Sequence, residues 1–299
     1  MIYTELSVVE KPVIEWLEEL DWKYVLPSDV RRAPEEPFEF ATLTKAIKRL
    51  NPDVIETDED VERVVSRVQR LSNDISGNKE FLDWLKGEKS IILKPGQKAK
   101  TVKLLDYEHV NNNSFVVTNQ FRFSGYENVR FDIVLMVNGI PLIIIEAKKP
   151  TATYDYTEAI KQLLRYHREA PQVFKHLAFV CATDGMTFKY NWIDENSYSY
   201  WRNPAFFDPV EGAVKGLFAR PQFLDMVNNF IVFEKTREEL TKKIARYQQV
   251  SAANRIVERV LKGRPKTGLI WHTQGSGKTL TMLFAAWKLK KIPRLKNPT

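Results

Sequence analysis

The sequence has little cysteine, no long apolar run, and few acidic residues near its C-terminal end. The single cysteine, Cys181, lies in the apolar stretch LAFVCAT, so an internal disulfide is excluded and we expect a small core residue. No run approaches the roughly 18 apolar residues of a membrane span. The first residues, MIYTELSVVEKP, contain neither the basic nor the apolar region of a secretory signal. We therefore expect a cytoplasmic protein with no membrane partner.

The shortage of acidic residues is local. Residues 251–299 contain 11 Lys and Arg but one acid, Glu258, whereas the other 250 residues contain 34 basic and 37 acidic side chains. The net charge of +7 therefore comes from the C-terminal segment, and it is weak evidence that the rest of the chain binds nucleic acid.

The order of the expected elements indicates an α/β protein. Apolar spacing predicts helices over residues 5–20 and 40–50, and a third helix capped by Thr57 and Asp60. From residue 101 the spacing of the apolar residues changes from that of helices to that of strands. We expect strands at 101–110, 114–123, 129–148 (a hairpin), 177–182 and 186–190, with one helix at 156–168. This order predicts a mixed sheet flanked by helices.

The remaining third of the chain has a different pattern. Residues 196–220 are aromatic and proline-containing, and we expect an irregular junction there. Helices are expected at 221–230, 237–247 and 252–261, followed by a strand at 267–271.

The segment FDIVLMVNGIPLIIIEAKKP, residues 131–150, holds the first candidate site. Asn138-Gly139 between two apolar runs predicts a buried β-hairpin. Asp132, Glu146 and Lys148 stand at one end of it, and charges in a buried strand are costly unless they are paired or bind a metal ion. Glu146 and Lys148, two residues apart on a strand, project to the same face. Two carboxylates for Mg²⁺ and a lysine beside them suit phosphodiester hydrolysis, with an exposed strand end as the structural alternative.

The register of this hairpin decides whether the two carboxylates can meet. A strict two-residue turn would place Asp132 opposite Ile145, and Asp132 and Glu146 would then point to opposite faces. A shared metal site requires one extra residue near Gly139-Ile140-Pro141, so we predict a bulge or a longer loop there.

A second candidate site is the stretch WHTQGSGKT. An expected strand, then Gly275, Ser276, Gly277, Lys278 and Thr279, then an apolar helix are the parts of a P-loop, which would bind ATP with Mg²⁺. Lys278 would reach the β- and γ-phosphates and Thr279 would hold Mg²⁺. His272 stands where the usual pattern has its first glycine.

Two observations qualify the P-loop. Upstream, RYQQ resembles the adenine-reading Q motif of superfamily-2 helicases, with Gln248 as the expected reader and a polar helix surface as the alternative. Downstream, no Asp or Glu follows Thr279, so the carboxylate that ATP hydrolysis needs is missing. We expect this 299-residue form to show no ATP hydrolysis and to be the front end of a longer motor.

The quoted motifs together resemble a known family. FDIVLMVNGIPLIIIEAKKP, a following Q-x-x-x-Y at Gln162 and Tyr166, a TDG turn, RYQQ and WHTQGSGKT are similar to the restriction (R) subunit of type I restriction–modification enzymes. The resemblance is strongest from about residue 100 onward, and His272 agrees with the family's P-loop.

The resemblance implies a fold and roles for particular residues. It implies a PD-(D/E)xK nuclease fold at residues 1–200, junction and linker helices at 201–245, and an incomplete first RecA-like motor lobe at 246–299. Asp132, Glu146 and Lys148 would be catalytic, with Asp132 and Glu146 as metal ligands and Gln162 and Tyr166 in support. Related nucleases add a carboxylate from the first helix. Glu5 and Glu10 both qualify by position, but the sequence favours a helix N-cap or surface role for each of them.

The same resemblance implies a function. The chain would be the Mg²⁺-dependent endonuclease part of an ATP-driven translocase that cuts double-stranded DNA non-specifically, with modification and specificity subunits as partners. Two alternatives stay open: a helicase or repair translocase whose N-terminal domain binds DNA without cutting it, and a module that docks partner subunits.

Overall fold

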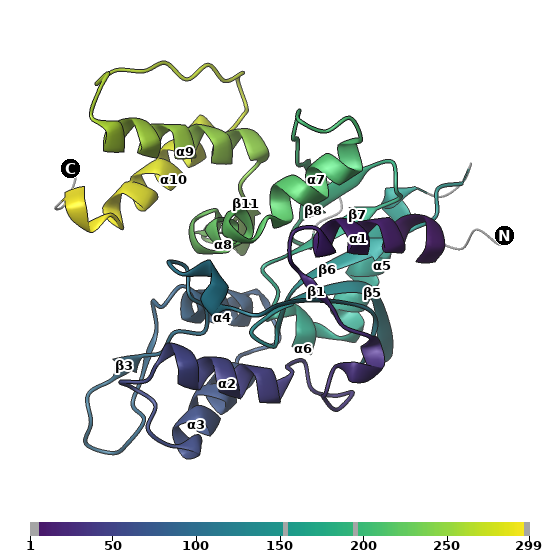
Figure 1. Ribbon diagram of the computed structural model, residues 1–299, viewed down its shortest axis with the longest axis vertical. Helices are drawn as coiled ribbons and strands as arrows, with labels where there is room; N and C mark the ends of the chain where they lie inside the picture. The colour runs from purple at the N-terminus through teal and green to yellow at the C-terminus, as the bar shows by residue number, and fades with distance from the viewer. Residues whose placement is uncertain (1–5, 152–154, 194–196, 296–299) are drawn as a thin grey trace.

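A mixed sheet forms the centre of the protein, as expected, and it has seven strands. The computed structural model describes residues 6–151, 155–193 and 197–295 (Figure 1). The strand order is β1–β4–β5–β6–β7–β8–β9, with β1 parallel to β4, β6 parallel to β7, and the other neighbours antiparallel. The strands are β1 (Lys23–Tyr24), β4 (Phe115–Ser124), β5 (Asn128–Val137), β6 (Ile140–Ala147), β7 (Phe179–Thr183), β8 (Phe188–Asn191) and β9 (Ser199–Tyr200).

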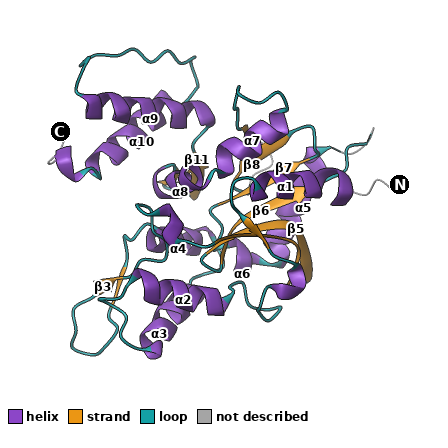
Figure 2. Ribbon diagram, in the orientation of Figure 1, coloured by secondary structure: helices purple, strands orange, loops and turns teal. Residues whose placement is uncertain are grey.

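Helices surround this sheet (Figure 2). They are α1 (Lys11–Glu18), α2 (Phe40–Leu50), α3 (Asp58–Gln69), α4 (Ile75–Leu85), α5 (Tyr156–Glu169), α6 (Pro171–Phe174), α7 (Pro209–Phe218), α8 (Arg220–Asn229), α9 (Tyr247–Lys262) and α10 (Lys278–Lys290). Shorter helical turns cover Leu6–Glu10, Pro27–Asp29, Val110–Asn112 and Pro293–Leu295, and two small hairpins pair β2 (Ser90–Ile91) with β3 (Lys100–Thr101) and β10 (Ile231–Lys235) with β11 (Leu240–Ile244). Within the described ranges, no helix could cross a membrane.

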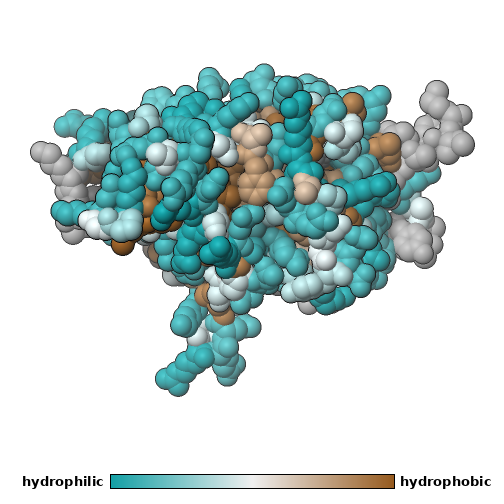
Figure 3. All heavy atoms as spheres, turned by 90° about the horizontal axis from the view of Figure 1, so that it is seen from below, coloured by the Kyte–Doolittle hydropathy of each residue, from teal (hydrophilic) through white to brown (hydrophobic). Residues whose placement is uncertain are grey.

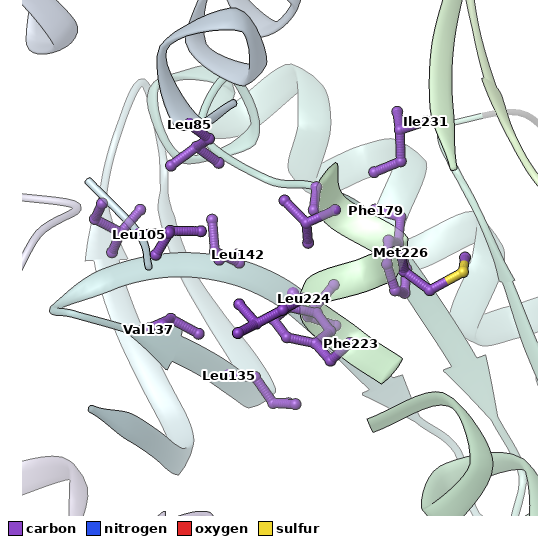
Figure 4. Packing of buried hydrophobic residues seen from close by; sticks show 14 of the residues in the cluster. Leu85, Leu105, Leu135, Val137, Leu142, Phe179, Phe223, Leu224, Met226 and Ile231 are labelled. Atoms are coloured by element: carbon purple, nitrogen blue, oxygen red, sulfur yellow. The ribbon is translucent and has the colours of Figure 1, made fainter. Parts of the chain in front are cut away.

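Apolar side chains pack on both faces of the sheet. On one face, α5 contacts β5, β6 and β7, and Leu163 lies in a cluster with Ile144 and Val180. On the other face, Phe179 and Cys181 belong to a larger cluster that includes residues of α1, α7 and α8. Figure 4 shows α8 side chains beside those of β5 and β6. A sheet covered on both faces explains why β6 is buried at every position.

The tip of the β5–β6 hairpin is fixed by local chemistry and by burial. Asn138 and Gly139 have φ angles of 53° and 78°, the left-handed values that a tight two-residue turn needs. A Cβ on Gly139 would lie 2.5 Å from the Glu39 carbonyl oxygen, so glycine is required there. The fully buried Asn138 side chain donates a hydrogen bond to the Leu104 carbonyl oxygen. The tip is therefore covered by the chain around Leu104.

The Thr57 cap is also confirmed. Thr57 accepts a hydrogen bond from the Asp60 backbone and Asp60 accepts one from the Thr57 backbone, so together they form a capping box at the start of α3.

The surface in Figure 3 is covered mostly by hydrophilic residues, and hydrophobic atoms show between them in smaller areas.

Five local expectations need correction, one of them only in where a helix begins. Residues 102–109 are not a strand but a loop, because Leu104 and Leu105 are buried against the hairpin tip. Residues 237–247 are not a helix but contain strand β11 of the β10–β11 hairpin, since the Tyr190 hydroxyl bonds the Ala245 carbonyl and Lys242 is buried. The helix expected at 252–261 already begins at Tyr247, and the irregular junction contains α7.

The strand expected at 267–271 is the last of these corrections. Residues 263–274 run between α9 and α10 without a strand partner among the described residues (Figure 1). Leu269 and Trp271 are 85% and 86% exposed. The apolar pattern was present, but no neighbouring strand pairs with it.

Candidate active site

The predicted irregularity in the β5–β6 hairpin is confirmed. Val137 pairs with Ile140 and Met136 with Pro141, but Leu135 pairs with Ile143, so Leu142 is an extra residue on β6. Leu142 and Ile143 are consecutive, yet both lie in the same core cluster. Such a bulge changes which side chains share a face.

The bulge brings the two carboxylates of the hairpin into register. The last recorded pair is Ile133 with Ile145, and the next positions along the two strands are Asp132 and Glu146. Both side chains are buried, with exposures of 3% and 0%. The Ala147 backbone N–H donates a hydrogen bond to Asp132 Oδ2 over 2.9 Å, which holds the Asp132 carboxylate across the end of β6.

Lys148 completes this end of the hairpin. Its Nζ lies 3.5 Å from Glu146 Oε1 and donates to the Ala147 carbonyl oxygen over 3.0 Å. Its backbone N–H bonds the Thr183 carbonyl on the neighbouring strand β7. The structure therefore brings together all three residues that the sequence selected at this hairpin.

The electrostatics of Glu146 are unfavourable for a carboxylate. Burial raises the pKa of Glu146 well above its ordinary value, and the nearby Asp132 raises it further, while Lys148 opposes both. Glu146 Oε2 is buried and has no hydrogen-bond partner. Two acidic groups close together, one with an unsatisfied buried oxygen, suit a divalent cation, because a bound cation favours both charged forms.

The ligand set also fits Mg²⁺ in kind. No group of three or more His, Cys, Asp or Glu side chains in the part of the chain that the structure describes could hold a metal ion. Mg²⁺ usually keeps several water ligands and needs only one or two carboxylates. Asp132 and Glu146 can supply those.

Helix α5 supports the hairpin through Gln162 and Tyr166. The Tyr166 hydroxyl donates to the Arg130 carbonyl oxygen over 3.0 Å, and Gln162 Nε2 donates to the same hydroxyl over 2.7 Å. Burial, and next the charge of Glu146, raise the pKa of Tyr166. The predicted pair thus contacts the backbone two residues before Asp132. Beside it, a hollow of about 360 Å³ is lined by Lys148, Glu158, Lys161, Gln162 and Arg165.

The structure also places Glu10, one of the two carboxylates considered from the N-terminus. Glu10 is 2% exposed and accepts hydrogen bonds from Gln120 Nε2 over 2.9 and 3.1 Å. Gln120 has a φ of 49° and lies on β4 between Asn119, which pairs with Ile133, and Phe121, which pairs with Phe131. Gln120 thus links Glu10 to the end of the hairpin that carries the site. Glu5 lies outside the described residues.

The P-loop residues lie at the start of α10. Gly275 and Gly277 have φ angles of 77° and 79°, and Lys278 is the first residue of the helix. Lys278 Nζ donates to the His272 and Thr273 carbonyl oxygens over 2.8 and 3.0 Å. Two glycines of this loop thus have left-handed backbone conformations, and its lysine bonds the loop's own carbonyls.

A glutamine that the sequence analysis missed holds this loop. Gln249 is 3% exposed, and its Nε2 donates to the Ser276 and Gly277 carbonyl oxygens over 3.1 and 3.2 Å. Its Oε1 accepts from the Arg246 backbone N–H at the start of α9. A glutamine three residues after a helix start is a capping signal, but the helix was expected to start later. The expected reader, Gln248, lines a hollow of about 550 Å³ beside His272, and its role stays a prediction.

Comparison with known proteins finds a family match for each of the two regions that carry these sites. The family model of the type I restriction enzyme R protein N terminus matches residues 2–195, and that of the SWI2/SNF2 ATPase matches residues 248–299. The chain is 34% identical over 258 residues to the putative type I restriction enzyme MjaVIIIP endonuclease subunit of Methanocaldococcus jannaschii, with 82% of the chain and 25% of that protein covered.

The chain is also similar to a type I restriction enzyme endonuclease subunit from a bacterium. The type I restriction enzyme HindI endonuclease subunit of Haemophilus influenzae is 30% identical over 326 residues, with 97% of the chain and 30% of that protein covered. The chain thus spans roughly a quarter to a third of the length of these relatives. It belongs to the family of type I restriction enzyme R proteins, of which it represents the N-terminal region.

Proposed function

We propose that residues 1–200 form a Mg²⁺-dependent endonuclease domain of the PD-(D/E)xK class, with Asp132, Glu146 and Lys148 as its catalytic residues. The observation that carries the proposal is the Leu142 bulge, because it aligns Asp132 with Glu146 at the end where Lys148 lies. The unsatisfied oxygen of Glu146 and its raised pKa support a cation at this position.

The residues have separate tasks in DNA cleavage. Asp132 and Glu146 would hold Mg²⁺, which supplies positive charge against the phosphate and lowers the pKa of a bound water. Lys148 orients the attacking water and places its ammonium charge near the phosphate oxygens as a P–O bond forms and another breaks. Tyr166 and Gln162 fix the backbone before Asp132 and so keep its carboxylate aligned.

We propose that the whole protein pumps DNA with ATP and cuts it non-specifically once translocation stalls, in a complex with modification and specificity subunits. The relatives' description as type I restriction enzyme endonuclease subunits and the SWI2/SNF2 match support this larger role. Backbone contacts alone suffice for such cutting, and the sequence contains no base-reading motif. The P-loop at 275–279 would bind ATP with Mg²⁺ in the whole motor. No Asp or Glu follows Thr279 in the 299-residue chain, so we expect no ATP hydrolysis from it, and turnover of ATP by this chain would contradict the proposal.

The decisive test compares two adjacent lysines. Lys148→Ala should slow the nicking of supercoiled plasmid in Mg²⁺ or Mn²⁺ by about 100- to 10,000-fold, the usual cost of losing a proton-transfer group. Lys149→Ala, a change at the neighbouring exposed position, should stay within about twofold of wild type. Equal nicking by the two variants would contradict a catalytic Lys148, whereas absence of nicking by the wild type would favour an N-terminal domain that binds DNA without cutting it.

A further inference from the structure

The sheet continues past the end of the candidate nuclease site. Recorded pairs between β5 and β6 stop at Ile133 and Ile145, whereas pairs between β4 and β5 continue to Ser124 and Asn128. Residues 121–131 therefore form a two-stranded extension, here called the β4–β5 arm, beside the position of Asp132. The curved strands near the β5 label in Figure 2 include it.

The arm carries an unusual pair of like charges. Arg122 on β4 pairs directly with Arg130 on β5, and both residues are exposed. Side chains directly opposite on neighbouring strands have Cβ atoms about 4.5–5.5 Å apart, and like charges in this position destabilise the sheet. Among the described residues, neither arginine forms an ion pair with a carboxylate, whereas the exposed Arg63 and Arg67 each pair with a glutamate. An anionic ligand bound here would reduce the repulsion between the two arginine side chains.

The backbone beneath both arginines is held in place. The Arg130 carbonyl accepts the Tyr166 hydroxyl, and the Arg122 carbonyl accepts a hydrogen bond from the Arg32 guanidinium. Arg32 itself packs 3.6 Å from the Phe121 ring centroid and donates to the Glu36 carbonyl oxygen over 2.8 Å. The two exposed guanidinium groups therefore extend from fixed positions, which lowers the entropy cost of binding a ligand.

The position of the pair matches the proposed substrate. Arg130 precedes Asp132 by two residues, so its backbone lies about 7 Å along the strand from that of Asp132, at about 3.3 Å per residue. Both arginines project from the face of the arm opposite Phe121 and Phe131, which pack with Tyr166. Phosphates follow one another at 3.4 Å of axial rise along each DNA strand. A phosphate one or two nucleotides from the cleaved bond would thus reach the arginines. The planar guanidinium fork also matches phosphate geometry.

We propose that Arg122 and Arg130 form a phosphate clamp that holds the backbone of double-stranded DNA beside the nuclease site. The proposal rests on the nuclease function proposed above and names residues for substrate positioning. The clamp binds duplex without reading its sequence, because both arginines contact only the backbone.

The test measures binding rather than cleavage. Fluorescence anisotropy with a labelled 30-base-pair duplex, in EDTA and between 50 and 200 mM salt, compares wild type with Arg122→Gln/Arg130→Gln. We expect the dissociation constant to rise about tenfold or more at 50 mM salt, and the slope of log K against log salt to weaken by roughly 2 units, or 0.9 per lost phosphate contact. The matched control Arg63→Gln/Arg67→Gln removes two exposed arginines of α3 and should leave both quantities unchanged.

A stability readout separates the clamp from a structural role. Removing two opposed like charges should leave the melting temperature of DNA-free Arg122→Gln/Arg130→Gln equal to wild type or higher. A melting temperature well below wild type would show that the arginines support the arm, and would overturn the clamp. So would a folded variant with unchanged affinity and salt slope, or an equal change in the control.

Failure of the nuclease proposal gives a different result. Asp132→Asn leaves the arm intact, so cleavage by that variant at the wild-type rate would refute the nuclease site. The binding measurement in EDTA does not depend on catalysis, so it tests the clamp whether or not the nuclease proposal holds.

Discussion

The β5–β6 hairpin and the P-loop segment both carry recognisable motifs, but their surroundings differ. Asp132 and Glu146 are buried in a seven-stranded sheet that is covered on both faces. Leu269 and Trp271, in contrast, are almost fully exposed, and Lys278 bonds the carbonyls of its own loop. Residues of β4, β7 and α5 contact the first motif, whereas the second is held mainly by hydrogen bonds from Gln249 on α9.

The difference shows what a motif supplies and what the fold adds. Residue types at a given spacing decide which chemistry is possible, but pairing and burial decide where the atoms lie. At the hairpin, burial and Asp132 raise the pKa of Glu146, which no spacing argument could give. Changes to the register of the hairpin should therefore have large effects, and changes to the P-loop lysine small ones.

The largest effect is expected from moving Glu146 to the other face. Inserting one valine between Ile145 and Glu146 keeps the pairs up to Ile133–Ile145 but shifts Glu146 and Lys148 by one position, and hence to the opposite face. Plasmid nicking should fall by more than about 100-fold, because even 1 Å of misplacement costs that much.

The matched control for the insertion is deletion of Leu142. Without it the turn becomes regular, yet Leu135 can still pair with Ile143 and Asp132 still lines up with Glu146. The deletion should retain cleavage and lower stability by about 2–5 kcal/mol, since Leu142 is fully buried. A folded deletion variant without cleavage, or an active insertion variant, would contradict the importance of the register. Circular dichroism establishes folding in each case.

A smaller effect concerns the stability of the hairpin as a function of pH. Because the folded-state pKa of Glu146 is raised, its stabilising contribution is complete below the ordinary value of 4.5 and is lost as pH rises through the folded-state pKa. Glu146→Gln should therefore raise the melting temperature in EDTA at pH 8 and change it little near pH 4.5. The shift should be about 2–4 °C for each 1 kcal/mol of relieved penalty.

Glu127→Gln is the control for this measurement, because Glu127 is exposed in the β4–β5 turn. Its melting temperature should follow wild type at both pH values. If Glu146→Gln melted below wild type at pH 8, the buried carboxylate would be stabilising and the argument for a cation there would fail.

The sequence predicted the parts that depend on local pattern. Asn138-Gly139 determined the turn, the alternation of faces required the bulge, and the four-residue spacing of Gln162 and Tyr166 placed them together. It did not predict contacts made by distant residues. Lys242 lies in a charged stretch that suggests an exposed helix, yet it is buried and donates to Asn78 Oδ1 and the Leu177 carbonyl. No local signal identifies a lysine that Asn78, 164 residues away, will satisfy.

The smallest effects are expected at the P-loop, where two polar side chains can be compared. Gln249→Ala should lower the free energy of unfolding by about 1–3 kcal/mol, because it leaves the Arg246 N–H and the Ser276 and Gly277 carbonyls without a buried partner. Lys278→Ala removes only bonds to the exposed His272 loop, so the change should stay within about 0.5 kcal/mol. Urea denaturation measures both, with Gln248→Ala as the neutral neighbour. If Lys278→Ala cost as much as Gln249→Ala, the lysine and not α9 would be holding the loop, and the P-loop would be a preformed site like the hairpin.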